Sequence, residues 1–174
     1  RSFKAAFRIL QPAIRFRKED CIDLPPVVFE TLEVDLSAEQ RQAYQAMRKR
    51  MALEFDDETT ITAVHAADKI NKLRQIACGV VRDPVSEEYI VLDYRPRLEA
   101  LLGVIAESST KVIVVVPFKG IVYDLADKIA RGYSCEVING DVSLAKRNDI
   151  INRFRNTPDP HVLLVHPKVM AHGL

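Results

Sequence analysis

The sequence predicts an open, mostly parallel α/β sheet with helices on its faces, preceded by a helical region. From Pro96 onward, amphipathic segments alternate with short apolar runs, in the order helix–strand–helix–strand–helix–strand. This order is typical of a parallel sheet with crossover helices. One of the runs, Lys111–Val116, is apolar and rich in β-branched residues after its first position. An unbroken run of this kind predicts a central strand that is covered on both faces.

Each element of this part has a local signal. Pro96 suits the first turn of a helix, and apolar side chains follow it at helical spacing. Asn139-Gly140 is typical of a turn that ends a strand, and the Ser143 hydroxyl can cap a helix. The predicted helices start near Pro96, Phe118 and Ser143, and the predicted strands are 111–116, 135–138 and 161–165.

The residues before Pro96 lack this alternation and predict two helices. Leu24-Pro25-Pro26 breaks the chain, and alternation over Val27–Leu36 predicts a strand. Ser37 and Gln40 have the spacing of a capping box, which predicts a helix to about Phe55. A second helix is expected over 61–77, with an apolar stripe on Val64, Ala67, Ile70, Leu73 and Ile76, followed by a short strand or hairpin around 89–92.

Composition excludes several classes of protein. The chain has 25 Lys plus Arg and 24 Asp plus Glu, so its net charge of +1 argues neither for nor against a nucleic-acid partner. Its longest apolar stretch, 112–116, is too short for a membrane span. The 3 cysteines have no CxxC spacing, which argues against a disulfide framework or zinc site and for a reducing compartment. The basic segment 1–23 fits a solvated surface or a phosphate contact, and both readings stay open.

Familiar catalytic motifs are also missing from this sequence. It contains no GxxxxGK[ST], GxGxxG or GxSxG, so the chain cannot by itself be a P-loop ATPase, an ordinary dinucleotide enzyme or a serine hydrolase of the elbow type. His161, His166 and His172 have no carboxylate or cysteine at ligand spacing. We therefore expect no metal site and no catalytic nucleophile.

The loops after the three predicted strands are the informative part. They are Pro117–Gly120, Asn139–Ser143 and His166–Gly173. In an open α/β sheet, ligands bind beyond the carboxyl ends of the strands, where these loops should emerge together. They offer amide donors, Lys119 and Lys168 without a nucleophile. Such a site is suited to binding phosphates rather than to cleaving bonds.

The ordered set of motifs resembles the second motor domain of Swi/Snf-type helicase-like ATPases of helicase superfamily two. The resemblance covers nearly the whole chain. The segments that carry it are Ala13–Lys18 with Leu24–Pro26, Val34–Ser37 with Gln40 and Tyr44, Lys72–Cys78, Lys111–Phe118, Val137–Ser143 with Lys146 and Arg147, and Val162–Leu174. The His-Pro…His-Gly-Leu form of the last segment is similar to phage and bacterial members.

This resemblance implies a RecA-like (P-loop NTPase-like) fold and roles for particular residues. By resemblance, contacts to the nucleic-acid backbone fall on Lys119, Gly140, His166 and Lys168. Gly173 would face the ATP cleft. Arg74 and Arg147 would hold their motifs in place. No catalytic residue and no metal ligand is implied within this chain.

The resemblance also implies an organisation and partners. Residues 1–36 would be a linker after a first motor domain, 37–92 a helical region packed on the second motor domain, and 93–174 that RecA-like domain, truncated within motif V. The parent would be an ATP-dependent DNA helicase or translocase that uses ATP and Mg²⁺. Its partners would be duplex DNA and its own first RecA-like domain, with no membrane. We expect a cytoplasmic protein of a bacterium or phage-infected host.

This chain alone should bind neither ATP nor Mg²⁺ and should not hydrolyse ATP, because the P-loop and the arginine finger lie outside it. A free-standing α/β module that binds nucleic acid or nucleotide without motor activity is the first alternative. A structural interaction domain whose loops are ordinary connections is the second.

Overall fold

The computed structural model describes residues 26–50, 52–54, 60–62 and 66–170. The chain divides into two compact units, Arg1–Leu32 and Glu33–Leu174. The basic segment 1–23 lies outside the described residues, as do Asp56–Glu58 and the last four residues of the chain. Within the described part, no helix is long and apolar enough to cross a membrane.

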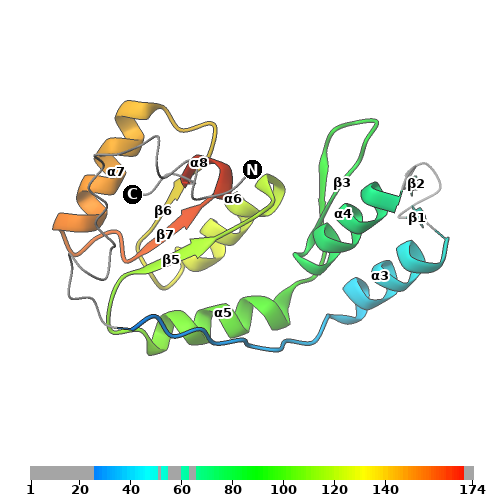
Figure 1. Cartoon of the computed structure of the whole chain (residues 1–174), viewed down its shortest axis with the longest axis horizontal. Helices are drawn as coiled ribbons and strands as arrows, with labels where there is room; N and C mark the ends of the chain where they lie inside the picture. Colours follow the sequence, from blue (N-terminus) through cyan, green and yellow to red (C-terminus); the bar gives the residue numbers. More distant parts are fainter. Residues whose placement is uncertain (1–25, 51, 55–59, 63–65, 171–174) are drawn as a thin grey trace, which may run out of the picture. The chain divides into compact units, whose positions relative to one another are not determined.

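A parallel sheet of three strands forms the centre of the second unit (Figure 1). Its strands are β5 (Val112–Val115), β6 (Cys135–Ile138) and β7 (Val162–Val165), in the order β5-β7-β6. Val115 and Ile138 both pair with Val165, so the strands end in register. Their carboxyl ends therefore meet at one edge of the sheet.

The middle strand is β7 and not β5, which corrects the prediction of a central strand at 111–116. All residues of β7 are buried, whereas Ile113 and Val115 on β5 are 43% and 59% exposed. In the described part of the chain, β5 pairs on one side only, with β7. A run of β-branched residues indicates a strand but does not show how many of its faces are covered. In β5 only the face of Val112 and Val114 packs against the core.

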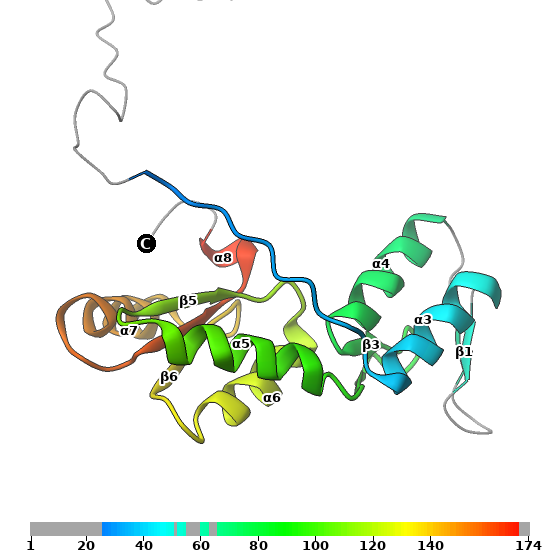
Figure 2. The same cartoon turned by 90° about the horizontal axis from the view of Figure 1, so that it is seen from below.

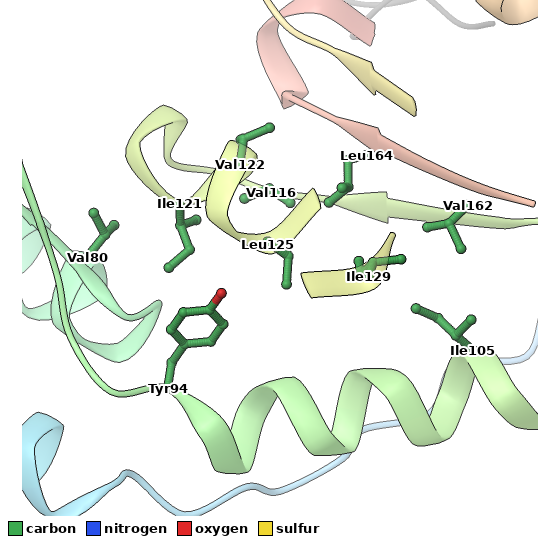
Figure 3. Packing of buried hydrophobic residues seen from close by; sticks show 10 residues of the cluster. All are labelled: Val80, Tyr94, Ile105, Val116, Ile121, Val122, Leu125, Ile129, Val162 and Leu164. Carbon is green, nitrogen blue, oxygen red and sulfur yellow. The ribbon is translucent and has the colours of Figure 1, made fainter. Parts of the chain in front are cut away.

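Helices cover both faces of this sheet (Figures 1 and 2). On one face lie α5 (Arg95–Glu107) and α6 (Lys119–Ile129), and on the other lies α7 (Leu144–Asn156). A further short helix, α8 (Pro167–Met170), follows β7. Figure 3 shows the core under α5 and α6, where Ile105, Leu125 and Leu164 meet. The pattern of helices and strands predicted after Pro96 is thus confirmed.

Two helices and two hairpins precede this layer. They are α3 (Ala38–Arg50), the hairpin of β1 (Ala52–Glu54) and β2 (Thr60–Thr62), α4 (Ala66–Ala77), and the hairpin of β3 (Val80–Arg82) and β4 (Tyr89–Val91). A short strand or hairpin was predicted around 89–92, and the structure has a hairpin there. The predicted helix ends were wrong, because β1 and β2 replace the end of the first helix and the start of the second.

The buried face of α4 also differs from the predicted apolar stripe. Ile76 is buried, but Ile70 is 60% exposed. Lys72 and Gln75 are buried instead of Ile70, and both bind the backbone of Arg82. The Lys72 ammonium donates to the Arg82 carbonyl, and the Arg82 N–H donates to Gln75 Oε1 at 3.1 Å. This polar face of α4 can be buried because its side chains form hydrogen bonds with the backbone groups of β3 that β4 does not pair.

No strand forms over 27–36, in contrast to the predicted alternation. Phe29 is 91% exposed and Val28 is 75% exposed. A strand needs a neighbour to take its backbone hydrogen bonds, and no described strand pairs with this segment. An alternating pattern of apolar side chains is thus not sufficient to form a strand.

Candidate functional site

The loops after the three parallel strands meet at one edge, as the sequence predicts. Val116 N–H donates to the Val165 carbonyl at 2.9 Å, and His166 N–H donates to the Ile138 carbonyl at 3.0 Å. These bonds continue the pairing of the sheet past the ends of its strands. They hold the starts of the loops side by side, so that residues far apart in the sequence share one surface.

Lys119 is the first residue of α6 and is paired across this edge. Its Nζ lies 2.7 Å from Asp141 Oδ2, with both side chains about half exposed at 51% and 48%. The hydrogen bond to Asp141 raises the pKa of the Lys119 ammonium. An incoming phosphate must therefore share or displace the Asp141 carboxylate to reach this amine. The pairing of Asp141 with Lys119 could not be predicted, because a pair 22 residues apart leaves no local signal in the sequence.

The turn from Asn139 to Ser143 is organised from within. Asn139 is 1% exposed, and its Oδ1 accepts from Asp141 N–H at 2.9 Å. Ser143 Oγ accepts from Lys146 N–H at 3.4 Å and so caps α7, as predicted. Gly140 lies exposed between them, and a Cβ placed on it would meet nothing within 4 Å. The backbone at Gly140 is therefore open to a ligand.

His166 and Lys168 lie where β7 passes into α8. His166 Nδ1 accepts from Lys168 N–H at 3.3 Å, so one ring nitrogen is used in shaping this turn. The Lys168 side chain is exposed, and its amine makes no ion pair within the described residues. Of the two lysines predicted to meet phosphate, Lys168 is thus the unpaired cation and Lys119 the paired one.

The two arginines from the resemblance each contact a loop at this edge of the sheet. The Arg74 guanidinium on α4 lies 5.9 Å from the centre of the Phe118 ring, in the loop after β5. Arg147 on α7 donates from Nη2 to the Val142 carbonyl at 3.4 Å. Its Nε is buried and has no partner among the described residues. A buried donor of this kind costs free energy until something accepts from it.

Gly173, which the resemblance assigns to the ATP cleft, lies outside the described residues. Within the described residues, no group of three His, Cys, Asp or Glu side chains could hold a metal ion. The site as described consists of cations, amides, the Ser143 hydroxyl group and the Asp141 carboxylate along one edge of the sheet.

Comparison with known proteins identifies the part of the chain that carries this edge. Residues 96–174 match the family model of the helicase conserved C-terminal domain. This segment is therefore similar to the C-terminal domain of helicases. The match begins at the start of α5 and includes all three parallel strands, so the α/β layer described above is RecA-like.

Two relatives extend the comparison. The chain is 28% identical over 156 residues to protein p41 of Acyrthosiphon pisum secondary endosymbiont phage 1, covering 89% of this chain and 31% of that relative. It is 31% identical over 117 residues to DEAD-box ATP-dependent RNA helicase 46 of Arabidopsis thaliana, covering 63% of this chain and 18% of that relative. The chain thus spans less than a third of the length of either relative.

Proposed function

We infer that this chain is the second motor domain, with its helical region, of an ATP-dependent DNA helicase or translocase of the Swi/Snf type. The observation that carries the proposal is the meeting of three loops at the carboxyl edge of a helicase C-terminal domain. They bring together Lys119, the open backbone at Gly140, His166 and Lys168. Through these groups the edge binds the phosphates of one DNA strand.

ATP belongs to the parent motor rather than to this domain alone. A first RecA-like domain supplies the P-loop and the Mg²⁺ site, and this domain closes on it. Closure then couples hydrolysis to movement along DNA, which lies across both domains. The chain alone hydrolyses no ATP, because catalysis needs groups from both sides of the cleft.

The choice of DNA rests on the motifs before Pro96. The segments 34–44 and 72–78 carry the Swi/Snf resemblance and precede the family match, which starts at 96. The similarity to p41 reaches over 89% of this chain and supports a phage or bacterial source. The plant relative is named as an RNA helicase, so duplex RNA is the ligand against which duplex DNA must be compared.

The test is a salt titration of binding to a short labelled DNA duplex. Each phosphate neutralised contributes a slope of about −0.9 in the logarithm of affinity against the logarithm of salt concentration. Lys119→Ala together with Lys168→Ala should weaken binding and reduce the slope by up to about 1.8. Lys49→Ala together with Arg131→Ala is the matched control, because both side chains are exposed on α3 and after α6.

The control pair removes the same charge and should leave the slope nearly unchanged. An unaltered slope in the Lys119 and Lys168 variant would overturn the assignment of these loops. Tighter binding to an RNA duplex than to the DNA duplex of the same sequence would overturn the choice of DNA. Neither result depends on ATP hydrolysis.

A further inference from the structure

Two tyrosines lie beside Lys119 and have no role in the site as described so far. Tyr89 comes from β4 and is 40% exposed, and Tyr123 comes from the first turns of α6 and is 50% exposed. Both rings are therefore accessible to a ligand. They belong to different elements, 34 positions apart in the printed sequence.

Tyr89 is held against the start of α6. Its ring packs on the backbone of Gly120, where any Cβ would overlap with the ring atoms. Glycine at this position therefore allows the β3–β4 hairpin to approach α6 closely. Gly120 is the second residue of α6, directly after Lys119. The contact therefore places the Tyr89 ring close to the start of the helix that Lys119 begins.

Tyr123 is held by a different contact. Its hydroxyl group accepts a hydrogen bond from Asn139 Nδ2 at 2.9 Å, and Asn139 is itself 1% exposed. The ring therefore has a defined position although half of it faces solvent. Tyr123 lies one helical turn after Lys119 in α6, on the same face of the helix, and the Tyr89 ring packs on Gly120, the neighbour of Lys119.

This arrangement joins a cation with two exposed aromatic rings. Proteins that bind single-stranded nucleic acid use the same combination: a cation meets the phosphate, and aromatic side chains stack on bases. Bases stacked inside a duplex present only their edges, so away from duplex ends the flat faces that these rings could contact are accessible only in unpaired nucleotides. Asp141, paired with Lys119, lowers the local positive charge and so weakens the attraction of this site for phosphate alone.

We propose that Tyr89 and Tyr123 form, with Lys119, a stacking site for an unpaired nucleotide of the bound strand. This inference rests on the proposed function, in which the same edge binds a nucleic-acid strand. It adds that the edge takes a strand with at least one base unstacked, as at a fork or junction. It also makes the β3–β4 hairpin, which lies before the helicase match, part of the interface.

The test compares three ligands of equal length: an oligothymidylate, an abasic oligonucleotide with the same phosphates, and a blunt duplex. Binding of each to the 174-residue chain is measured by fluorescence anisotropy. The oligothymidylate should bind roughly tenfold more tightly than the abasic strand, because stacking on the two rings adds affinity that the phosphates alone do not supply. Tyr89→Ala and Tyr123→Ala should each reduce this ratio severalfold, while Tyr89→Phe and Tyr123→Phe keep the rings and most of it.

Tyr133→Ala is the matched control. Tyr133 stacks on His161 with 5.8 Å between ring centres, at the opposite edge of the sheet, so its removal should leave the ratio unchanged. Circular dichroism establishes that each variant is folded.

The outcomes separate the two proposals. Equal affinity for the oligothymidylate and the abasic strand, with an intact effect of Lys119→Ala, would overturn the stacking site and leave phosphate binding standing. An equal loss in Tyr133→Ala would also overturn it. No binding of any ligand at low salt would overturn the proposed function as well.

Discussion

Gln40 and Ile76 join the start of one helix to the end of another. Gln40 Nε2 donates to the Ile76 carbonyl at 2.8 Å and to the Ala77 carbonyl at 3.3 Å. Its Oε1 accepts from Ser37 N–H at 3.2 Å. One side chain thus completes the capping box of α3 and also satisfies carbonyl groups left open at the end of α4.

We predict that Gln40→Ala lowers the free energy of unfolding by about 3 kcal/mol, because it leaves several buried polar groups without partners. The side chain is 1% exposed, so water cannot replace the lost bonds. Urea unfolding followed by circular dichroism measures the change. Gln45→Ala, at an exposed position of the same helix, should change stability by less than about 0.5 kcal/mol. Similar losses in the two variants would contradict this role of Gln40.

Two glycines predict opposite effects of the same substitution. Gly79 has φ +87°, and a Cβ there would lie 2.6 Å from Tyr94 Cβ, so Gly79→Ala should destabilise the protein by at least about 2 kcal/mol. Gly103 lies inside α5 with nothing within 4 Å of its Cβ position. Gly103→Ala should therefore stabilise by about 0.5–1 kcal/mol. Thermal unfolding of both variants tests the pair, and a shift of the same sign in both would refute the argument.

Tyr94 connects the start of α5 to α6 through Asp124. Its hydroxyl group donates to the Asp124 carboxylate, as Lys128 Nζ does at 2.9 Å, and Figure 3 shows the ring pointing from α5 towards α6. Burial acts to raise the pKa of Asp124, but the hydrogen bonds from Lys128 and Tyr94 together lower it below 3.8. A lowered carboxyl pKa contributes stability above that value, and this stability is lost as the pH falls below it.

Tyr94→Phe should therefore reduce stability by about 1–2 kcal/mol near neutral pH. The loss should shrink in acid, because protonation of Asp124 removes the charge that the hydroxyl group stabilises. Unfolding free energies measured on both sides of pH 3.8 check the sign. A difference between wild type and variant that grows in acid would show that the hydroxyl acts otherwise.

We predict that two cysteines, Cys78 and Cys135, lower the free energy of unfolding at alkaline pH. Burial raises the pKa of Cys135 from 9.0 to about 11 and also raises that of Cys78. A raised thiol pKa contributes stability that is complete below 9.0 and is lost as the pH rises above it, because the unfolded chain ionises first. Each thiol can contribute up to about 1.4 kcal/mol per pH unit. In Cys135→Ala the alkaline slope should be shallower than in wild type, and an identical slope would exclude Cys135 as a cause.

Asp141→Asn should strengthen binding to nucleic acid. The substitution removes the carboxylate that pairs with Lys119 at 2.7 Å and leaves a neutral side chain of similar shape. We expect severalfold tighter binding at low salt and a steeper salt dependence, since a phosphate then meets an unpaired ammonium. Asp149→Asn, on an exposed part of α7 where Arg153 is its partner, is the control. Weaker binding by Asp141→Asn would mean that the carboxylate itself takes part in recognition.

Much of the fold follows from signals a few residues long. The strand 135–138, the cap at Ser143 and the capping box of Ser37 and Gln40 all agree with the structure. These features depend on turn chemistry, on side-chain periodicity and on hydrogen bonds within one turn of helix. No signal of this kind marks β1 and β2, so the two helices were predicted to be longer than they are in the structure.

The edge that we propose to bind nucleic acid was identified from chain order, since loops after parallel strands must share an edge. Chain order did not indicate which charged side chains meet at this edge. The pairing of Lys119 with Asp141, the packing of Tyr89 on Gly120 and the burial of Lys72 each join distant positions in the chain.

The position of β7 in the middle of the sheet is of the same kind. Local preferences of residues decide where helices and strands form, because backbone hydrogen bonds and side-chain spacing act over a few residues. The choice of neighbours is settled by packing among elements that the sequence keeps far apart.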